Sequence, residues 1–251
     1  MQMKMHNKRK QCWEDTKKRC EKIADHVTSI KINYVTECLK NNRKKYHRSE
    51  ICIYDMDTID CSLLFKNSLI LNLADNYFPG GYVEEGAAAQ EESIFRRTTY
   101  CKTLVKSLYP IENDEAIYSP NVSLLKMNEE NDWKLYPDDK IKLQLIACPG
   151  IKYPSTNNER LNERDVQLLE VKIRLIIQCA VKYNHDIIIF GALGCGAWKN
   201  SPHHVAEIFK EILLEYDGII STFVFAILTR KDNWCILKDK MVLDVFKEIL
   251  L

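Results

Sequence analysis

The chain has 251 residues, of which 46% are hydrophobic and 28% charged, enough apolar material for the core of one large domain or a domain with an extension. Ten cysteines are scattered without a C-x-x-C pair, so neither a zinc site nor a disulfide framework is predicted. No apolar run approaches the roughly 20 residues of a membrane helix, and Met1–Gln11 lacks the apolar part of a signal peptide. We therefore expect a soluble intracellular protein, cytoplasmic or nuclear, with reduced thiols.

Charge is unevenly distributed along the chain. Residues 1–50 hold 14 Lys and Arg against 6 Asp and Glu, a net charge of +8, whereas the remainder carries a net charge of −7. Such a basic segment can contact nucleic acid or another polyanion, or it can be a solvated helix face. Apolar positions between Lys8 and Leu39 recur at helical spacing. We expect residues 1–49 to form a basic helical extension and residues 50–251 to form the main domain.

The main domain is predicted to begin with two strands around a short helix. Ile51–Tyr54 is the first core strand, and Asp57 or Thr58 caps the helix that follows. Ser68–Ala74 is a second apolar strand. Pro79-Gly80-Gly81 stops this strand, because proline fixes φ and glycine permits positive φ.

A pair of carboxylates follows this glycine loop. The helix predicted from Ala88 to Ser107 opens with Gln90, Glu91 and Glu92. Two adjacent acids beside a loop whose backbone can approach a ligand indicate acid/base chemistry on a phosphate- or sugar-bearing substrate. The alternative is that the acids only interact favourably with the helix dipole and that the glycines only form a turn.

The second half of the chain alternates strands and helices. The predicted elements are short strands at Tyr118–Pro120 and Ser123–Met127, a loop from 128 to 140, strands at Lys142–Ala147, Ile187–Phe190 and Thr222–Leu228, and helices at Asp165–Tyr183, Pro202–Tyr216 and Trp234–Leu251. The apolar run Ile187–Phe190 is typical of a sheet covered on both faces. The glycine loop Gly191–Trp198 then precedes a helix capped by Ser201, which presents backbone N–H groups to a phosphate. His203 and His204 are interpreted as surface residues.

A family resemblance rests on the first glycine loop. The residues P-G-G-Y-V-E-E-G-A-A-A-Q-E-E-S, followed by R-R-T, resemble the signature of microbial-type poly(ADP-ribose) glycohydrolases, a branch of the macrodomain superfamily. The resemblance covers about residues 50–230. It implies an α/β fold, a macrodomain-like three-layer α/β/α sandwich with a mixed central sheet, here with the N-terminal helical extension. Tyr82 departs from the pattern, because it stands where the family has a third glycine.

The resemblance also implies a set of site residues. Glu92 would be the catalytic acid and then base, and Glu91 would orient the ribose hydroxyls. The implied ADP-ribose-binding residues are Asp57, Asn72, Asp75, Gly80, Gly81, Tyr82, Gln90, Gly191, Gly194, Cys195, Gly196, Ala197, Trp198 and Phe225. Asp57 would meet the adenine edge or cap a helix, Trp198 would wall the distal ribose or fill the core, and Phe225 would stack on adenine or belong to the core.

The implied activity is hydrolysis of the ribosyl bond of protein-linked ADP-ribose, without a cofactor or a metal. The substrate is either mono-ADP-ribosylated arginine, which includes arginine of ubiquitin, or poly(ADP-ribose). The ring of Tyr82 is expected to narrow the loop and penalise positive φ, which favours a single ADP-ribose unit. The alternatives are a non-catalytic ADP-ribose reader, which has no physical need for the acid pair, and a nucleic-acid-binding protein led by the basic N-terminus. The expected partners are ADP-ribose and an ADP-ribosylated protein or the polymer, with neither a membrane nor nucleic acid.

Overall fold

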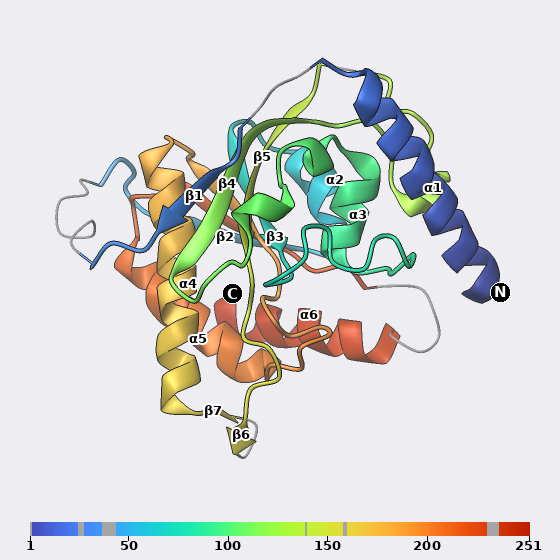
Figure 1. The fold of residues 1–251 in the computed structure, drawn as a ribbon. Helices are drawn as coiled ribbons and strands as arrows, with labels where there is room; N and C mark the ends of the chain where they lie inside the picture. The colour runs from blue at the N-terminus through green and yellow to red at the C-terminus, as the bar shows by residue number, and fades with distance from the viewer. Residues whose placement is uncertain (1, 25–27, 37–43, 139, 158–159, 230–235) are drawn as a thin grey trace.

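A mixed β-sheet between two layers of helices forms the protein (Figure 1). The computed structural model describes residues 2–24, 28–36, 44–138, 140–157, 160–229 and 236–251. Within these residues one seven-stranded sheet has the order β1-β4-β5-β3-β8-β9-β2. Its strands are β1 (Ile30–Asn33), β2 (Glu50–Tyr54), β3 (Ser68–Leu73), β4 (Glu115–Ser123), β5 (Lys142–Cys148), β8 (Ile187–Phe190) and β9 (Thr222–Ala226). A separate hairpin joins β6 (Thr156–Asn157) to β7 (Arg160–Leu161).

The two helical layers bury opposite faces of this sheet. The helices are α1 (Gln2–Lys22), α2 (Thr58–Ser62) and α3 (Gln90–Arg97) on one face, and α4 (Glu163–Lys182), α5 (Pro202–Glu215) and α6 (Ile236–Leu250) on the other. Strand residues divide by alternation, because successive side chains point to opposite faces. Leu69 and Leu71 pack with α4 to α6, whereas Ile70 between them packs with α1 to α3. The predicted three-layer α/β/α fold is confirmed.

The carboxyl ends of the central strands meet at one edge of the sheet. β3 lies between β5 and β8 and runs parallel to both, so the loops that follow these strands leave from the same edge. Two glycines allow the chain segments at this edge to approach one another closely. A Cβ on Gly150 would lie 3.0 Å from Cα of Gly194, and a Cβ on Gly191 would lie 3.1 Å from the side chain of Leu73. In open α/β sheets a ligand binds at this edge.

The N-terminal segment is more than a helical extension. α1 is a helix as expected, but residues 30–33 form β1, which pairs antiparallel with β4. The alternation of Ile30 and Ile32 with polar residues suits a half-buried edge strand, and pairing with β4 prevails over the helical spacing read across this stretch. α1 packs on α3, where the rings of Trp13 and Phe95 lie 6.0 Å apart and Thr16 Oγ1 donates to the carbonyl of Arg96 at 2.6 Å.

α3 is shorter than predicted. It ends at Arg97 instead of Ser107, because Thr98 is extended and pairs with Leu124 while the N–H of Leu125 bonds to the carbonyl of Arg97. Two 3₁₀ turns follow, η2 (Tyr100–Lys102) and η3 (Lys106–Leu108), and a third, η4 (Glu129–Asn131), lies in the predicted loop. The two strands predicted around residue 121 are wrong: β4 is one strand with a bulge between Ser119 and Val122.

His204 is buried, so its assignment to the surface is wrong, whereas His203 is exposed. Nδ1 of His204 accepts the N–H of Leu161 at 2.8 Å, which ties α5 to the β6–β7 hairpin. Burial lowers the pKa of His204, so the ring is neutral at pH 7 and Nδ1 can accept.

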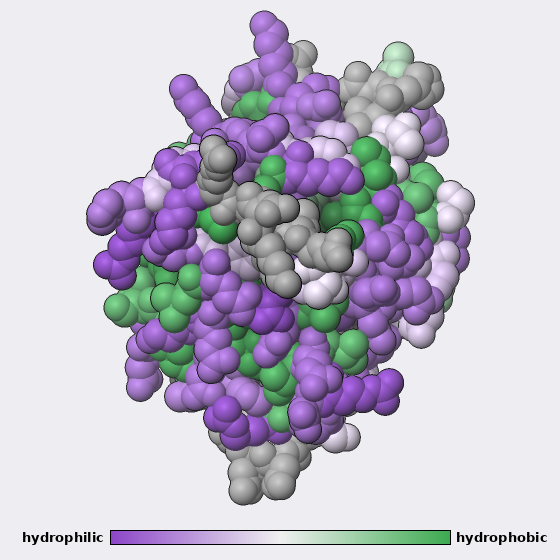
Figure 2. Space-filling model, turned by 90° about the vertical axis from the view of Figure 1, so that its left-hand side faces the viewer, coloured by the Kyte–Doolittle hydropathy of each residue, from purple (hydrophilic) through white to green (hydrophobic). Residues whose placement is uncertain are grey.

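The described helices include none that combines the length and apolarity of a membrane span. The face seen in Figure 2 is largely polar, with apolar side chains in small separate groups.

If α1 belongs to the same folding unit as the sheet, Trp13→Ala destabilises the whole protein. Trp13 is buried against Phe95, and truncation of a buried tryptophan costs about 3–5 kcal/mol. Urea unfolding followed by circular dichroism measures the free energy of unfolding. Met3→Ala, at an exposed position of the same helix, is the control and should leave it within about 0.5 kcal/mol. An unchanged midpoint for Trp13→Ala would show that α1 is dispensable.

Candidate active site

The loop after β3 folds back so that its N–H groups face the first turn of α3. Oδ1 of Asp75 accepts the N–H groups of Tyr77 and Phe78 at 2.8 and 3.0 Å. The carbonyl of Phe78 then accepts the N–H of Gly81 at 3.0 Å. Gly80 and Gly81 have φ of +82° and +54°, a backbone region that side chains disfavour. The loop is thus a fixed turn.

Glu91 is the buried anchor of this loop. Its carboxylate is 3% exposed and accepts three hydrogen bonds, from Asp75 N at 2.8 Å, Gly80 N at 3.2 Å and Asn72 Nδ2 at 3.2 Å. Burial raises the pKa of Glu91 to about 8, the three donors oppose that rise, and the neighbouring Glu92 adds to it. At neutral pH the adjacent acids therefore carry less than two negative charges.

Glu92 differs from its neighbour in how its oxygens are partnered. Oε1 accepts the N–H of Tyr82 at 3.0 Å, whereas Oε2 is buried and has no partner in the described part of the chain. Gly81 makes this arrangement possible, because a Cβ there would lie 2.6 Å from Glu92 Oε1. The sequence places the acids side by side, but only the structure distinguishes the carboxyl that accepts three N–H groups from the one with a buried oxygen that has no described partner.

Arg96 lies one helical turn beyond Glu92 and was not predicted as a site residue. Its guanidinium is buried, and Nε and Nη1 have no partner among the described residues. Burial lowers the pKa of Arg96 to about 10, and Glu92 opposes that shift by attraction. Arg96 therefore supplies positive potential on the protein side of Glu92.

Gln90 and Asn72 connect the acids to the sheet. Gln90 Oε1 accepts the N–H of Leu73 at 2.8 Å, and Nε2 donates to the carbonyl of Leu71 at 2.7 Å. Asn72 is buried at the end of β3, and its Oδ1 has no described partner. These contacts fix the start of α3 against β3, so the carboxylates stand on a rigid support.

Asp75 and Tyr82 complete the first loop. Asp75 pairs with Lys152 of the loop after β5, whose Nζ lies 3.9 Å from Oδ2. The side chain of Tyr82 is 57% exposed, and its backbone is outside the positive-φ region. The expected narrowing of the loop is wrong, because the ring extends toward solvent and only the N–H of Tyr82 approaches Glu92.

Asn200 holds the second glycine loop, 191–198, through hydrogen bonds to backbone carbonyls. Nδ2 of Asn200 donates to the carbonyls of Gly194 at 3.0 Å and Ile151 at 2.7 Å, so it joins the loops after β8 and β5. Gly194 has φ of +78°, and a Cβ there would lie 2.6 Å from this amide. A Cβ on Gly196 would meet no atom within 4 Å. Cys195 is buried, Gly196 and Ala197 are exposed, and Trp198 is partly buried.

Two predicted binding residues occupy the alternative roles. Asp57 caps α2 by accepting the N–H of Ile59 at 2.8 Å, and it pairs with Arg97. Phe225 is fully buried in the core, with ring centroids 5.1 to 5.5 Å from those of Phe190, Phe209 and Phe246. It has no exposed face for an adenine.

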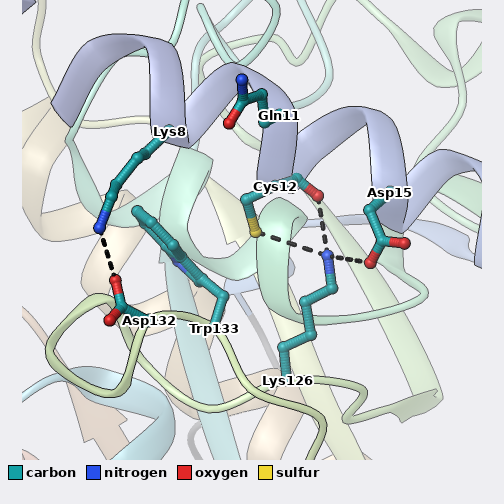
Figure 3. A pocket seen from close by; sticks show the side chains of 7 residues that line it. All are labelled: Lys8, Gln11, Cys12, Asp15, Lys126, Asp132 and Trp133. Carbon is teal, nitrogen blue, oxygen red and sulfur yellow. Dashed lines mark hydrogen bonds and ion pairs between the residues drawn. The ribbon is translucent and has the colours of Figure 1, made fainter. Parts of the chain in front are cut away.

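A pocket of about 290 Å³ lies beside α1 (Figure 3). It is lined by α1 and the segment 126–133, and its inner wall is the buried Lys126. Nζ of Lys126 bonds to the carbonyl of Cys12 at 2.8 Å and to Asp15 at 2.9 Å. The ammonium is therefore used in joining α1 to the body. Among the described residues, no three His, Cys, Asp or Glu side chains are grouped as a metal site requires.

Comparison with known proteins identifies close counterparts of the fold. The sequence model of the family described as "Microbial-type PARG, catalytic domain" matches residues 2–127, half of the chain. The structure of poly(ADP-ribose) glycohydrolase (PARG) from Thermomonospora curvata is similar over 96% of this chain and 98% of that one, with a TM-score of 0.81 at 19% identity. Its complex with the inhibitor ADP-HPD gives the same coverage and identity with a TM-score of 0.78. PARG from Deinococcus radiodurans in complex with ADP-ribose is similar over 88% of this chain and 94% of that one, with a TM-score of 0.72 at 22% identity. No match was found among curated proteins.

The raised pKa of Glu91 predicts a pH dependence of stability. The folded state keeps the Glu91 proton up to about pH 8, whereas the unfolded chain loses it near 4.5, so folding takes up a proton between these values. The free energy of unfolding should therefore fall as pH rises from 5 to 8, by up to about 1.4 kcal/mol per pH unit. Urea unfolding at a series of pH values measures this slope.

Glu91→Gln removes the titrating group and should flatten the slope, whereas Glu85→Gln, at an exposed position of the same loop, should retain it. Equal slopes for both variants would show that Glu91 titrates normally.

Proposed function

Because this chain belongs to the family of microbial-type PARG catalytic domains, we propose that it hydrolyses the ribosyl bond that links ADP-ribose to a further ADP-ribose unit or to a protein, releasing ADP-ribose. The observation that carries the proposal is the asymmetry of the acid pair. Glu91 accepts three N–H donors, whereas Oε2 of Glu92 is buried without a partner among the described residues, and a Cβ on Gly81 would lie 2.6 Å from the other oxygen, Oε1.

Glu92 would supply the chemistry in two steps. Protonated at Oε2, it gives its proton to the departing atom as the bond to the anomeric carbon breaks, and the sugar gains oxocarbenium character. The resulting carboxylate then takes a proton from the water whose oxygen attacks that carbon, which restores the acid. Arg96 would stabilise the carboxylate between the steps, and the protonated state of Glu91 limits repulsion within the pair.

The second glycine loop would bind the diphosphate. It follows β8 at the edge of the sheet where α/β folds hold ligands, and it precedes the N-terminus of α5. Asn200 holds the loop through Gly194, and Gly196 leaves open space where a Cβ would otherwise stand. Asn72, Asp75 and the glycines of the first loop would contact the ribose next to the acids.

Between the two substrates, we propose the polymer. The preference for a single unit depended on crowding by Tyr82, and that ring extends toward solvent. Arginine-linked ADP-ribose, on ubiquitin or another protein, is the alternative substrate. Measuring ADP-ribose release from both substrates side by side distinguishes them.

The rival functions have less support. A non-catalytic ADP-ribose-binding module has no need for a buried carboxylate oxygen without a hydrogen-bond partner. The basic charge of the N-terminus is partly used within the protein, because Arg9 pairs with Glu129 at 2.7 Å, Lys8 with Asp132 at 2.8 Å and Lys17 with Glu84 at 3.1 Å. α1 therefore offers less free charge to nucleic acid than its sequence suggests.

Glu92→Gln should retain ADP-ribose binding and lower turnover by about 10²–10⁴-fold, the range that general acid–base catalysis provides. The measurement is release of ADP-ribose from poly(ADP-ribosyl)ated protein and from arginine-mono-ADP-ribosylated ubiquitin, side by side. The wild type should release it from the polymer, and Glu85→Gln should match the wild type. Full activity of Glu92→Gln would refute its role, and release from ubiquitin alone would make the protein an ADP-ribosylarginine hydrolase.

Gly196→Val should weaken ADP-ribose binding at least tenfold and leave the melting temperature nearly unchanged, because the added side chain enters open space in the second loop. Gly194→Val is the contrasting variant and should lower the melting temperature, since its φ of +78° and the contact with Asn200 both oppose a side chain. Calorimetric titration with ADP-ribose and thermal unfolding separate the two effects. Undiminished binding by Gly196→Val would remove the ligand from this loop.

A further inference from the structure

The first loop has an outer side that the catalytic proposal does not use. Its N–H groups at Asp75, Gly80 and Tyr82 point inward to the two carboxylates. On the same loop the side chains of Tyr77, Phe78 and Tyr82 are 54%, 52% and 57% exposed. Scattered single apolar residues are normal on a surface, but three half-exposed aromatic side chains within six residues of one loop point to a binding partner.

The backbone that carries Tyr77 and Phe78 is held in the same turn that contacts the acids. Asp75 Oδ1 binds the N–H groups of both Tyr77 and Phe78. Lys106, from η3, donates to the carbonyl of Tyr77 at 2.6 Å. The segment is thus already ordered in the free protein. Binding by the exposed rings therefore loses less conformational entropy.

A cation accompanies the aromatic rings. Nζ of Lys106 lies 4.4 Å from the centroid of the Phe78 ring, and Lys106 is itself exposed. The acidic residue Glu84 lies further along the loop, where it pairs with Lys17 of α1. Exposed aromatic faces next to a lysine are the combination that binds single-stranded nucleotides, because bases stack on the rings and phosphates pair with the cation.

We infer that Tyr77, Phe78, Tyr82 and Lys106, here called the aromatic rim, bind the ADP-ribose unit on the leaving-group side of the scissile bond. The rim would stack the adenine of that neighbouring unit and place its diphosphate near Lys106. This assignment rests on the proposed function and deepens it, since it makes a polymer the substrate. The occupant is a nucleotide, because a polypeptide leaving group provides neither a purine face nor a diphosphate.

The test compares three ligands in the Glu92→Gln background, where the polymer is not consumed. Fluorescence anisotropy measures the affinities for poly(ADP-ribose) and for a mono-ADP-ribosylated protein, and calorimetry measures that for free ADP-ribose. Tyr77→Ala and Phe78→Ala should each weaken polymer binding about tenfold or more and leave ADP-ribose affinity within twofold. Phe78→Tyr keeps a ring and should restore polymer binding. Leu214→Ala, an exposed apolar residue of α5, is the matched control and should change neither affinity.

The outcomes separate the rim from the catalytic proposal. Unchanged polymer affinity in both alanine variants, with ADP-ribose still bound by the parent, would overturn the rim alone. Failure of the parent to bind ADP-ribose or the polymer would overturn the proposed function and the rim with it. A loss of affinity in the alanine variants for a mono-ADP-ribosylated protein, as large as that for the polymer, would assign the rim to the polypeptide and overturn the nucleotide assignment.

Discussion

The site depends on one buried carboxyl group. Glu91 is buried, and its carboxyl group accepts hydrogen bonds from two backbone N–H groups of the loop after β3 and from the side-chain amide of Asn72. A buried polar group without partners is costly, so the loop cannot leave this arrangement without exposing or orphaning the carboxyl. The loop held in this way has positive φ at Gly80 and Gly81 and places Tyr82 N against Glu92, while Asp75 Oδ1 holds the backbone of the exposed Tyr77 and Phe78.

Neighbouring positions on one helix thereby take different roles. Glu91 accepts hydrogen bonds from the loop and has a raised pKa, whereas Oε2 of Glu92 has no partner among the described residues. The sheet adds the second part of the site, because β3 and β8 are parallel neighbours and deliver both glycine loops to the same edge. Asn200 holds the second glycine loop and Gln90 holds the start of α3 against β3, so the catalytic proposal rests on groups that local contacts already hold.

Much of this arrangement was readable in the sequence, and the failures have physical causes. The central strands, α4 and α5 follow from the apolar pattern, and the QEE run shows where the two acids lie. Pairing with β4 made residues 30–33 a strand, and the extended Thr98 shortened α3, both through contacts distant in sequence. The contacts of Asn200 and Arg96 and the orientation of Tyr82 also depend on residues distant in sequence. Such residues gain their roles only from what packs against them, so the sequence alone does not reveal those roles.

The most direct test of this account is the calorimetric affinity for ADP-ribose of Glu91→Ala beside Glu92→Ala, with the fold of each variant checked by circular dichroism. If Glu91 anchors the loop and Glu92 performs the chemistry, Glu91→Ala should lose affinity at least tenfold, while Glu92→Ala should bind within about threefold of the wild type. Tight binding by a folded Glu91→Ala would contradict the account, because it would show that the loop keeps its shape without the buried carboxyl group.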